Sequence, residues 1–453
     1  MLGRTKKIHF VGIGGIGMSG IAELLLNQGF EVSGSDLKNS KIIKKLKEKG
    51  AFIKIGHDAN LIKNTDVVVK SSAVSNNNPE IAAALQQKIP VIRRAEMLAE
   101  IIRMSYGIGI AGTHGKTSTT SMVGSILAAA KLEPTVIVGG IVKNFGSNNL
   151  LGSGKYIVVE ADEFDRSFLS LSPIIAGITN IEADHLDCYA NLENVKDAFI
   201  EFANKVPFFG SVIACLDDPG VQSIIPKINK EILTYGFSKQ AQIRADNLKM
   251  ENFCSSYQLV VQGEKKEKIE LNVMGEHNVL NSLLAIGVGL ELEVPLKNIK
   301  KGLKQYSGVF RRFEHKGKWH SIDFYDDYAH HPTEISATLK GVKESTDRRV
   351  ITVFQPHLYS RTKDFFEDFG RSFFHSDILI ITPIYPAREK PIDGVTGKLI
   401  ADVAVQSGHK NVIYVKDNDD IVKTIKRIAK PNDIVITMGA GNIYQYGEKI
   451  LES

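Results

Sequence analysis

The residues that most clearly indicate a chemical function lie in segment 108–120, which reads IGIAGTHGKTSTT. An apolar run typical of a strand leads into a tight glycine turn, and small hydroxyl residues then open a helix. The N–H groups of such a turn can surround an anion, the lysine adds positive charge, and the hydroxyl after it can hold Mg²⁺. The following helix directs its positive end at the same place. The segment predicts a site for ATP or another nucleoside triphosphate, formed by Gly112, Thr113, His114, Gly115, Lys116, Thr117 and Ser118.

This loop departs from the standard phosphate loop at one position. The usual pattern has a glycine five positions before the Gly-Lys pair, and Ile110 stands there instead. The alternative is a glycine turn that precedes a lysine by chance. The strand before the turn and the helix after it favour the phosphate loop.

Polar residues also follow two later apolar runs. Glu160 opens the sequence EADE directly after YIVV, and His185 lies in ADHLD after the run 174–179. The carboxyl ends of parallel strands form the crevice in which ligands bind. Glu160 is therefore predicted as a second Mg²⁺ contact beside Thr117. His185 is predicted either as a metal ligand or as a residue near the phosphates.

Two asparagines, Asn278 and Asn281, lie at the start of a predicted helix over residues 277–290. Their amide groups suit the edge of an adenine ring. Capping of the helix by Asn278 explains that residue equally well.

A dense polar cluster, DDYAHHPTE, occupies residues 326–334 between an apolar strand and a helix. So many titratable groups at a strand end indicate a functional site, and Thr333 is expected to cap the helix as well. Arg361 and Arg388 follow the next two apolar runs. Both suit a carboxylate or a phosphate.

The N-terminal segment carries a dinucleotide-type fingerprint. Gly12, Gly14 and Gly17 fit G-x-G-x-x-G after an apolar strand, and Asp36 ends the next strand, EVSGSD. The glycines let a pyrophosphate approach the backbone, and the acid reaches a ribose hydroxyl. Any ligand with a nucleoside diphosphate fits, NAD included. The second, complete triphosphate site argues against an NAD-dependent dehydrogenase.

Composition places the chain among globular proteins of several domains. Its 453 residues suggest about three domains. A net charge of +5 suits anionic small molecules and falls short of the basic stripe of a nucleic-acid binder. No run of about 18 apolar residues and no signal peptide is present, and the three cysteines have no metal spacing. We therefore expect a cytoplasmic protein with no membrane insertion and with reduced, buried cysteines.

Strands alternate with helices throughout, which predicts an α/β fold with parallel sheets in three domains, residues 1–106, 107–306 and 307–453. Strands are expected near residues 8–11, 31–36, 66–70, 91–92, 156–159, 174–179, 211–216, 269–273, 322–325, 350–354, 378–382, 412–415 and 434–438.

The ordered set of motifs resembles the Mur ligases over almost the whole chain. These motifs are VGIGGIGMSGIAELL, AGTHGKTSTT, EADE, ADHLD, GEHNVLN, RRFE, DDYAHHPTE and FQPHLYSRT. The resemblance implies a Rossmann-like N-terminal domain for a UDP-sugar, a central P-loop-type ATPase domain and a Rossmann-like C-terminal domain. It also implies ATP and Mg²⁺ as cofactors, and leaves monomer or homodimer open.

The resemblance assigns roles to individual residues. Gly14, Gly15 and Gly17 would face the UDP pyrophosphate, with Asp36, Ser71 and Ser72 near the uridine. Lys116 would hold phosphates, Thr117 and Glu160 one Mg²⁺ and His185 a second. Asn278 and Asn281 would face adenine, and Arg312 and Asp327 would reach the nucleotide across the domain joint. His330, His331 and Arg361 would lie near an incoming amino acid.

The implied reaction is ATP-driven amide formation on UDP-N-acetylmuramate through an acyl phosphate, an early step of peptidoglycan synthesis. The motifs GIGGIGMSG and DDYAHHPTE favour L-alanine as the added group. A sister ligase that adds a tripeptide in wall recycling is the alternative, and a non-enzymatic nucleotide-dependent binding protein is a third hypothesis.

Overall fold

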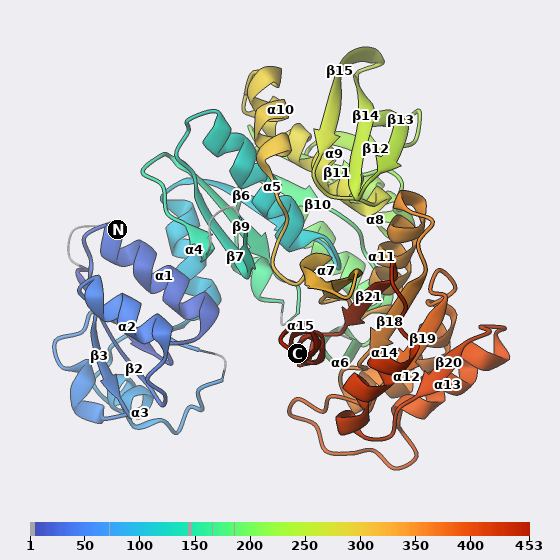
Figure 1. Cartoon of the computed structure of the whole chain (residues 1–453). Coiled ribbons are helices and arrows are strands. Elements are labelled where there is room, and N and C mark those ends of the chain that lie inside the picture. The colour runs from blue at the N-terminus through green and yellow to red at the C-terminus, as the bar shows by residue number, and fades with distance from the viewer. Residues whose placement is uncertain (1–4, 72, 144–146, 165, 185) are drawn as a thin grey trace. The chain divides into compact units, whose positions relative to one another are not determined.

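The computed structural model describes residues 5–71, 73–143, 147–164, 166–184 and 186–453 (Figure 1). Two predicted site residues, Ser72 and His185, lie outside the described residues. Strands and helices alternate along most of the chain, and the strands form three sheets.

The N-terminal sheet has five parallel strands in the order β3-β2-β1-β4-β5. Its strands are β1 (Lys7–Val11), β2 (Glu31–Asp36), β3 (Phe52–Ile55), β4 (Val67–Lys70) and β5 (Val91–Arg93). Its helices are α1 (Ile16–Asn27), α2 (Lys41–Glu48), α3 (Pro79–Gln86) and α4 (Arg94–Arg103). The lysine-rich α2 buries Ile43 and Leu46, the apolar positions of an amphipathic helix.

The central sheet has ten strands in the order β15-β14-β13-β12-β11-β10-β6-β9-β7-β8. They are β6 (Tyr106–Ala111), β7 (Thr135–Val142), β8 (Ser147–Leu150), β9 (Tyr156–Ala161), β10 (Ile175–Ile178), β11 (Ser211–Cys215), β12 (Glu231–Gly236), β13 (Ile243–Glu251), β14 (Cys254–Val261) and β15 (Glu264–Leu271). The helices are α5 (Lys116–Ala129), α6 (Leu186–Tyr189), α7 (Leu192–Asn204), α8 (Pro219–Ile224), α9 (Glu276–Glu291) and α10 (Leu296–Gln305). The middle strands are parallel and almost fully buried, as expected where helices cover both faces.

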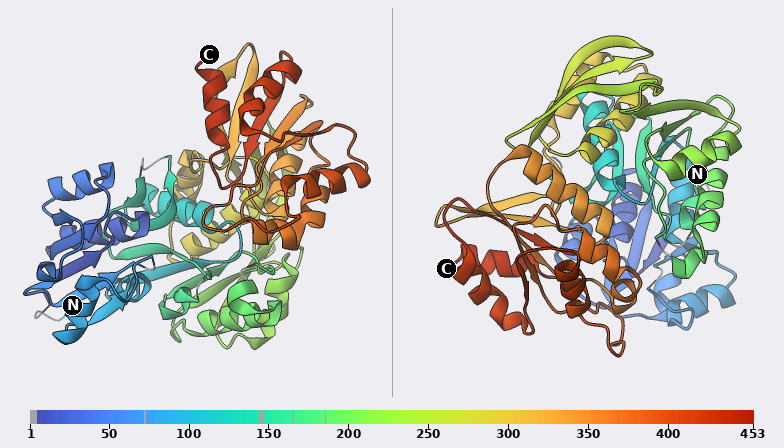
Figure 2. Two further views of the ribbon diagram at one scale, coloured as in Figure 1. Left: turned by 90° about the horizontal axis from the view of Figure 1, so that it is seen from below. Right: turned by 90° about the vertical axis from the view of Figure 1, so that its right-hand side faces the viewer.

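The C-terminal sheet has the order β16-β17-β21-β18-β19-β20, with only β16 antiparallel to its neighbour. Its strands are β16 (Glu314–Trp319), β17 (Ile322–Asp327), β18 (Val350–Phe354), β19 (Ile378–Ile381), β20 (Val412–Tyr414) and β21 (Ile434–Met438). Its helices are α11 (Pro332–Ser345), α12 (Tyr359–Arg371), α13 (Gly397–Gln406), α14 (Ile421–Ile428) and α15 (Tyr444–Leu451). Two separate apolar cores, one with residues of α11 to α13 and one with residues of α14 and α15, lie on the two faces (Figure 2).

Most predicted strands are present within a residue or two. The strands that the sequence did not indicate are mostly polar or lie toward sheet edges: β3, β7, β8, β12 to β14 and β16. The strand expected at 269–273 is the end of β15, whose sequence EKKEKIEL is largely exposed. Except for β7, TVIVGGIV, these strands lack the continuous apolar run of a buried parallel strand.

The chain forms two compact units, each of which combines segments that are separate in the sequence. One comprises residues 1–246, 259–267 and 280–306, and the other 247–258, 268–279 and 307–453. The tip of the β13–β14 hairpin therefore belongs to the same unit as the C-terminal sheet.

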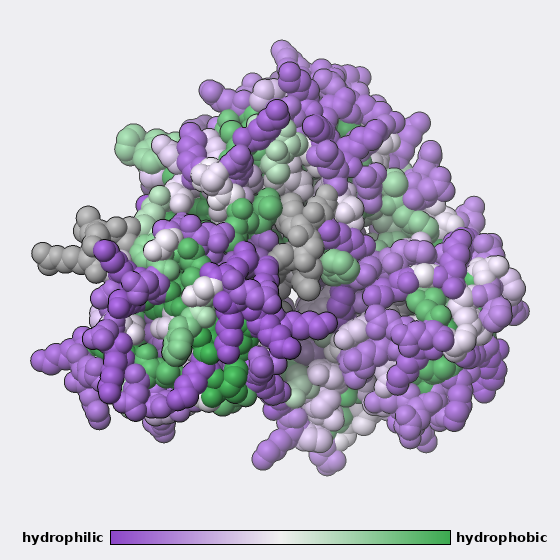
Figure 3. Space-filling model, turned by 60° about the vertical axis from the view of Figure 1, so that its left-hand side comes forward, coloured by the Kyte–Doolittle hydropathy of each residue, from purple (hydrophilic) through white to green (hydrophobic). Residues whose placement is uncertain are grey.

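The surface view in Figure 3 shows mainly hydrophilic side chains with small apolar patches. Among the described residues, no helix is both long enough and apolar enough to cross a membrane. The three cysteines are free, but only Cys215 is buried. The expected burial was wrong for Cys188, in α6, and for Cys254, the first residue of β14, because both are exposed.

Candidate nucleotide and ligase site

The predicted phosphate loop connects β6 to α5. Gly115 is the residue before α5 and has a left-handed backbone with φ of 83°, and Gly112 has φ of 141°. Both conformations favour glycine because a Cβ atom is disfavoured there. The turn thus places the N–H groups at the start of a 14-residue helix around one point, where an anion is stabilised.

Residues at the end of β10 hold this loop. The Thr179 hydroxyl donates to the carbonyl of His114 at 2.6 Å, and Asn180 Oδ1 accepts from the N–H of His114 at 2.8 Å. A Cβ atom added to Gly112 would lie 1.8 Å from Thr179 Oγ1. Gly112 is therefore required by a close approach as well as by its φ angle.

Lys116 is bound in the centre of the loop. Its Nζ donates to the carbonyls of Gly112 and Thr113 at 2.7 and 3.2 Å and lies 2.8 and 3.0 Å from the two carboxylate oxygens of Glu163. Burial opposes the charge of Lys116, but Glu163, Asp162 and Glu160 outweigh it and raise the pKa of the lysine. The ammonium group is therefore charged and oriented into the loop.

Glu163 was missed by the sequence reasoning, which singled out only Glu160 of the EADE run. Its side chain is 3% exposed, and burial raises its pKa to about 7 although Lys116 counteracts this. The signal in the sequence was present, since Glu163, the second glutamate of EADE, lies just after the end of β9.

Glu160 fits a magnesium ligand beside Thr117. Burial raises the pKa of Glu160, while a hydrogen bond from Thr117 lowers it. Its Oε2 accepts from the N–H of Gly139, and its Oε1 is buried without a hydrogen-bond partner in the part of the chain that the structure describes. A buried carboxylate oxygen without a partner is costly unless a cation or water satisfies it. These two oxygen donors at the phosphate loop match the few protein ligands that Mg²⁺ takes beside phosphates.

The two asparagines of α9 differ in their surroundings. Asn281 is buried, and a Cβ atom on Gly115 would lie 2.5 Å from Asn281 Oδ1, so this side chain packs on the phosphate loop. Asn278 Nδ2 donates to the carbonyl of Met274 at 2.8 Å. Asn278 lies inside α9 and not at its N-cap, so the expectation that it caps this helix is wrong.

The N-terminal glycine turn is closed by β2. The carbonyl of Ser35 accepts from the N–H groups of Gly12 and Ile13 at 2.9 and 3.0 Å. Asp36 Oδ2 accepts from the N–H of Gly14 at 2.8 Å, and its Oδ1 accepts from the N–H of Lys38. In this structure the Asp36 carboxylate therefore orders the turn itself.

The other predicted residues of this turn lie beside it. Gly15 is the N-cap of α1, and Ser71, at the end of β4, would contact a Cβ atom on Gly12 at 3.2 Å. A Cβ atom on Gly17 would lie 2.5 Å from the guanidinium of Arg94. Arg94 places a positive charge against the start of α1, and the sequence reasoning did not single it out.

The polar cluster of the C-terminal unit gathers between β17 and α11. Asp327 accepts hydrogen bonds from the N–H groups of Phe313 and Ala329 and from the Thr338 hydroxyl, at 2.8 to 3.1 Å. Burial raises the pKa of Asp327 to about 6, against the charge of Arg312. Asp327 thus fixes the turn that carries Arg312.

Arg312 and His330 both meet Glu334, in the first turn of α11. Arg312 Nη1 donates to Glu334 Oε1 at 3.0 Å, and the N–H of His330 donates to Glu334 Oε2 at 3.0 Å. Burial lowers the pKa of His330 to about 4, and the nearby charge of Arg361 acts in the same direction. His330 is therefore neutral near pH 7. The helix N-cap is His331, so the expected capping by Thr333 is wrong.

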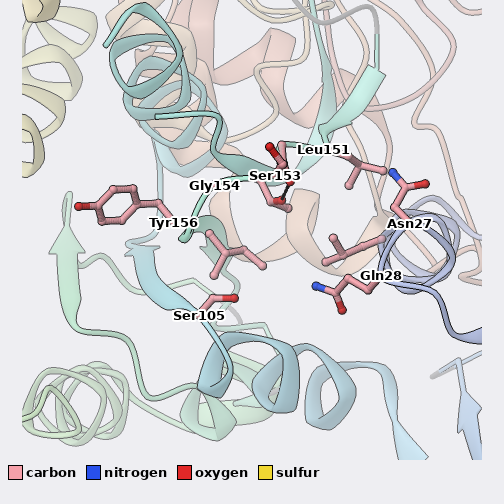
Figure 4. Close-up of a pocket in the computed structure, with 11 residues that line it drawn as sticks. Asn27, Gln28, Ser105, Leu151, Ser153, Gly154 and Tyr156 are labelled. Carbon is pink, nitrogen blue, oxygen red and sulfur yellow. Dashed lines mark hydrogen bonds between the residues drawn. The ribbon is translucent and has the colours of Figure 1, made fainter. Parts of the chain in front are cut away.

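A pocket of about 330 Å³ lies elsewhere, at the amino ends of β6 and β9 and the end of α1 (Figure 4). Its lining includes Asn27, Gln28, Ser105, Ser153 and Tyr156 (Figure 4). None of its lining side chains is charged, and the phosphate loop lies at the opposite ends of these strands. The pocket is therefore separate from the predicted phosphate loop.

Three family models match successive parts of the chain. They are described as Mur ligase family, catalytic domain (residues 7–106), Mur ligase middle domain (110–289) and Mur ligase, glutamate ligase domain (311–441). The chain belongs to the Mur ligase family. The three-domain α/β fold predicted from the sequence is thereby confirmed.

Individual relatives agree with this assignment. The Mur ligase described here is 51% identical to the UDP-N-acetylmuramate–L-alanine ligase of Geotalea daltonii, over 100% of this chain and 99% of the relative. It is 50% identical to the ligase of the same name from Salinibacter ruber, over 100% and 95% of the two chains. Among solved structures, the UDP-N-acetylmuramate-alanine ligase MurC of Thermotoga maritima matches with a TM-score of 0.80, 29% identity and 98% coverage of both chains.

Proposed function

We propose that this Mur ligase joins L-alanine to the carboxylate of UDP-N-acetylmuramate with hydrolysis of ATP, an early step of peptidoglycan synthesis. The observation that carries the proposal is identity of about 50% over the whole chain to ligases named for this reaction. The charged Lys116 in a glycine turn at a helix N-terminus supports the use of a triphosphate.

Lys116 and the N–H groups at the start of α5 offset the negative charge that accumulates when the sugar carboxylate attacks the γ-phosphate in line. Thr117 and Glu160 would hold Mg²⁺, which supplies further positive charge and orients the phosphates. His185 is proposed for a second Mg²⁺ ion. Asn281, packed on Gly115, and Asn278 would face the adenine ring.

The resulting acyl phosphate is attacked by the amine of L-alanine, and phosphate leaves. No covalent bond to the enzyme is needed, so the chain acts by positioning its ligands and excluding water. His330, neutral near pH 7, and Arg361 are proposed to lie near the amino acid, with Arg312 and Asp327 reaching the nucleotide. Closure of the domains around the substrates accompanies each turnover in this proposal.

The UDP-sugar is proposed to bind at the N-terminal glycine turn, with Gly14, Gly15 and Gly17 facing the pyrophosphate and Asp36, Ser71 and Ser72 near the uridine. The hydrogen bond from Gly14 to Asp36 supports this placement, because it orders the turn that a pyrophosphate would approach. In this proposal the UDP-sugar is made in the cytoplasm and the protein acts there. It binds no nucleic acid and does not insert into a membrane.

The alternative is a ligase that adds a tripeptide to the same UDP-sugar. Structures of murein peptide ligase from Psychrobacter arcticus and from Neisseria meningitidis match at only 24% and 27% identity, the first over 99% and the second over 67% of this chain. Identity to ligases named for L-alanine is higher, at about 50%. This favours addition of L-alanine over addition of a tripeptide.

Phosphate release with each substrate omitted in turn tests the proposal. We expect release only when UDP-N-acetylmuramate, ATP and L-alanine are all present, and its loss when Mg²⁺ is chelated. Replacement of L-alanine by the tripeptide is the matched control. Release with the tripeptide and not with L-alanine would establish the alternative, and release with ATP alone would contradict both.

A further inference from the structure

The buried carboxylate of Glu163 occupies the place on Lys116 at which a phosphate oxygen is needed. Both of its oxygens lie within 3.0 Å of Nζ. A lysine has three N–H donors, and the carbonyls of Gly112 and Thr113 accept as well. The hydrogen-bonding capacity of Lys116 is therefore fully used within the protein.

The main chain holds Glu163 firmly in this position. Its carbonyl accepts from the Tyr189 hydroxyl at 2.6 Å and from the N–H of Arg166 at 3.0 Å. Tyr189 is the last residue of α6, which begins within the ADHLD segment, so a second element of the central domain fixes the glutamate. A side chain on an anchored backbone loses little entropy in pairing with the lysine, which strengthens the pair.

A triphosphate must take at least one N–H of Lys116 from these partners. The two carbonyls belong to the loop that wraps the phosphates, whereas Glu163 enters from the end of β9. An anionic carboxylate and an anionic phosphate at the same ammonium group repel each other. Glu163 is thus the partner that nucleotide binding displaces or weakens.

We propose that Glu163 is an internal competitor for phosphate at Lys116. It keeps the ammonium group charged and directed into the loop, and it lowers the affinity for nucleotide so that the product ADP leaves readily. The inference rests on the proposed function only in that the loop binds ATP. Glu163 is a positioning residue here and not a group that touches the reacting atoms.

The test is calorimetric titration of ADP and of ATP, with Mg²⁺, into wild type and Glu163→Gln. We expect the glutamine variant to bind ADP about tenfold more tightly, because it removes the competing charge and keeps the side-chain volume. Asp162→Asn is the matched control: this neighbouring acid also acts on the charge of Lys116, but it is exposed, so its effect is screened by solvent, and its Oδ1 accepts from the N–H of Phe164. The affinity of Asp162→Asn for ADP should stay within about twofold of the wild-type affinity.

Steady-state kinetics separate a competitor from a merely structural residue. With a competitor, Glu163→Gln lowers both the KM for ATP and the inhibition constant of ADP, and product release becomes slower. A damaged loop would raise both constants. Unchanged or weaker ADP binding by a folded Glu163→Gln protein overturns the inference.

Two outcomes keep this inference distinct from the proposed function. Failure of the wild type to bind ATP refutes the proposed function, whatever the variants do. If the wild type binds ATP tightly and Glu163→Gln binds nucleotide no more tightly, only the proposed competitor role of Glu163 is refuted. Should Glu163→Gln not fold, Glu163→Asp, which draws the charge back from Nζ, decides in the same way.

Discussion

At the scale of the residue, the site depends on buried charges whose partners are already in place. Lys116 is held by Glu163 and two loop carbonyls, and Asp327 by two N–H groups and a hydroxyl. A charge that is already oriented needs little reorganisation during reaction, which is the basis of electrostatic stabilisation in a transition state; at Lys116 we infer that nucleotide binding first weakens the contact with Glu163. Removing such a group should therefore affect catalysis far more than ground-state binding of a distant ligand.

Replacement of Lys116 by alanine tests this at the phosphate loop. We expect kcat/KM for ATP to fall by about a thousandfold or more, because the charge facing the γ-phosphate is lost. Binding of UDP-N-acetylmuramate, measured by titration without ATP, should stay nearly unchanged. Lys297→Ala, at an exposed position of α10, is the control and should retain full activity. Turnover retained in the Lys116 variant would refute the role given to this lysine.

His277 provides a pH-dependent prediction in the C-terminal unit. Burial lowers the pKa of His277 to about 4, and Arg312 acts in the same direction. The unfolded chain takes up a proton below about pH 6.5, whereas the folded protein does so only near pH 4. The free energy of unfolding should therefore fall as the pH decreases from about 6.5 to 4.

Denaturant unfolding at pH 5 and at pH 7.5 checks this for wild type and His277→Gln. The decrease on acidification should be smaller in the variant by about 1–2 kcal/mol, a value reduced for the partial exposure of the ring. The difference in free energy of unfolding between the two proteins at pH 7.5 measures the packing that the substitution removes, and it is the internal control. Equal pH dependence of the two proteins would show that His277 takes up its proton normally in the folded state.

At the scale of the element, the strand–turn–helix unit of β6 and α5 forms the turn at which we propose that the triphosphate binds. Neither the strand nor the helix alone places the N–H groups, because the direction of the chain is set by Gly112 and Gly115. Gly115 must accommodate both a left-handed backbone and the side chain of Asn281. The turn is therefore the part of this unit least tolerant of substitution.

We expect Gly115→Ala to weaken ATP binding at least about tenfold, since the new Cβ atom would meet Asn281 and the backbone is strained at a positive φ. Fluorescence titration with a nucleotide analogue measures the effect. Gly408→Ala is the matched control: Gly408 also has a positive φ, of 99°, but nothing lies within 4 Å of the added atom. It should lose only about 1 kcal/mol of stability and keep full nucleotide affinity. Equal affinities in the two variants would contradict the close approach of Asn281.

At the scale of the whole molecule, sequence order and structural unit do not coincide. The tip of the β13–β14 hairpin comes from the central third of the chain but belongs to the unit of the C-terminal sheet. Phe253 at this tip lies 5.5 Å from the ring of Phe313 and 5.5 Å from that of Tyr325, which stack on each other at 4.3 Å. These rings lie beside the turn that carries Arg312.

Phe253→Ala should therefore lower the stability of the C-terminal unit by about 1–3 kcal/mol, through loss of aromatic packing. Thermal unfolding followed by circular dichroism measures this loss. Phe208→Ala is the control, because Phe208 is 94% exposed and should contribute little. A variant as stable as the wild type would show that the hairpin tip makes no energetic contribution to this unit.

The sequence by itself determined the features that depend on local chemistry. A glycine turn between an apolar strand and a helix must form an anion site, and the alternation of apolar runs with amphipathic stretches must give parallel sheets with helices on both faces. Lys116, Glu160 and the glycines of both turns were predicted as site residues for this reason. The edge strand β16 and the exposed first half of β15 were not, because both carry polar residues; β16 is stabilised by pairing with β17.

Only the tertiary structure decided which charged groups meet. Glu163 reaches Lys116 across 47 positions of the sequence, and the Asp36 carboxylate binds the glycine turn 22 positions before it. Such pairs depend on the order of strands in a sheet, which brings the ends of separate segments to one edge, and no local pattern encodes that order. The residue types therefore predicted the chemistry, and the fold decided that the lysine of the phosphate loop has an anionic partner of its own.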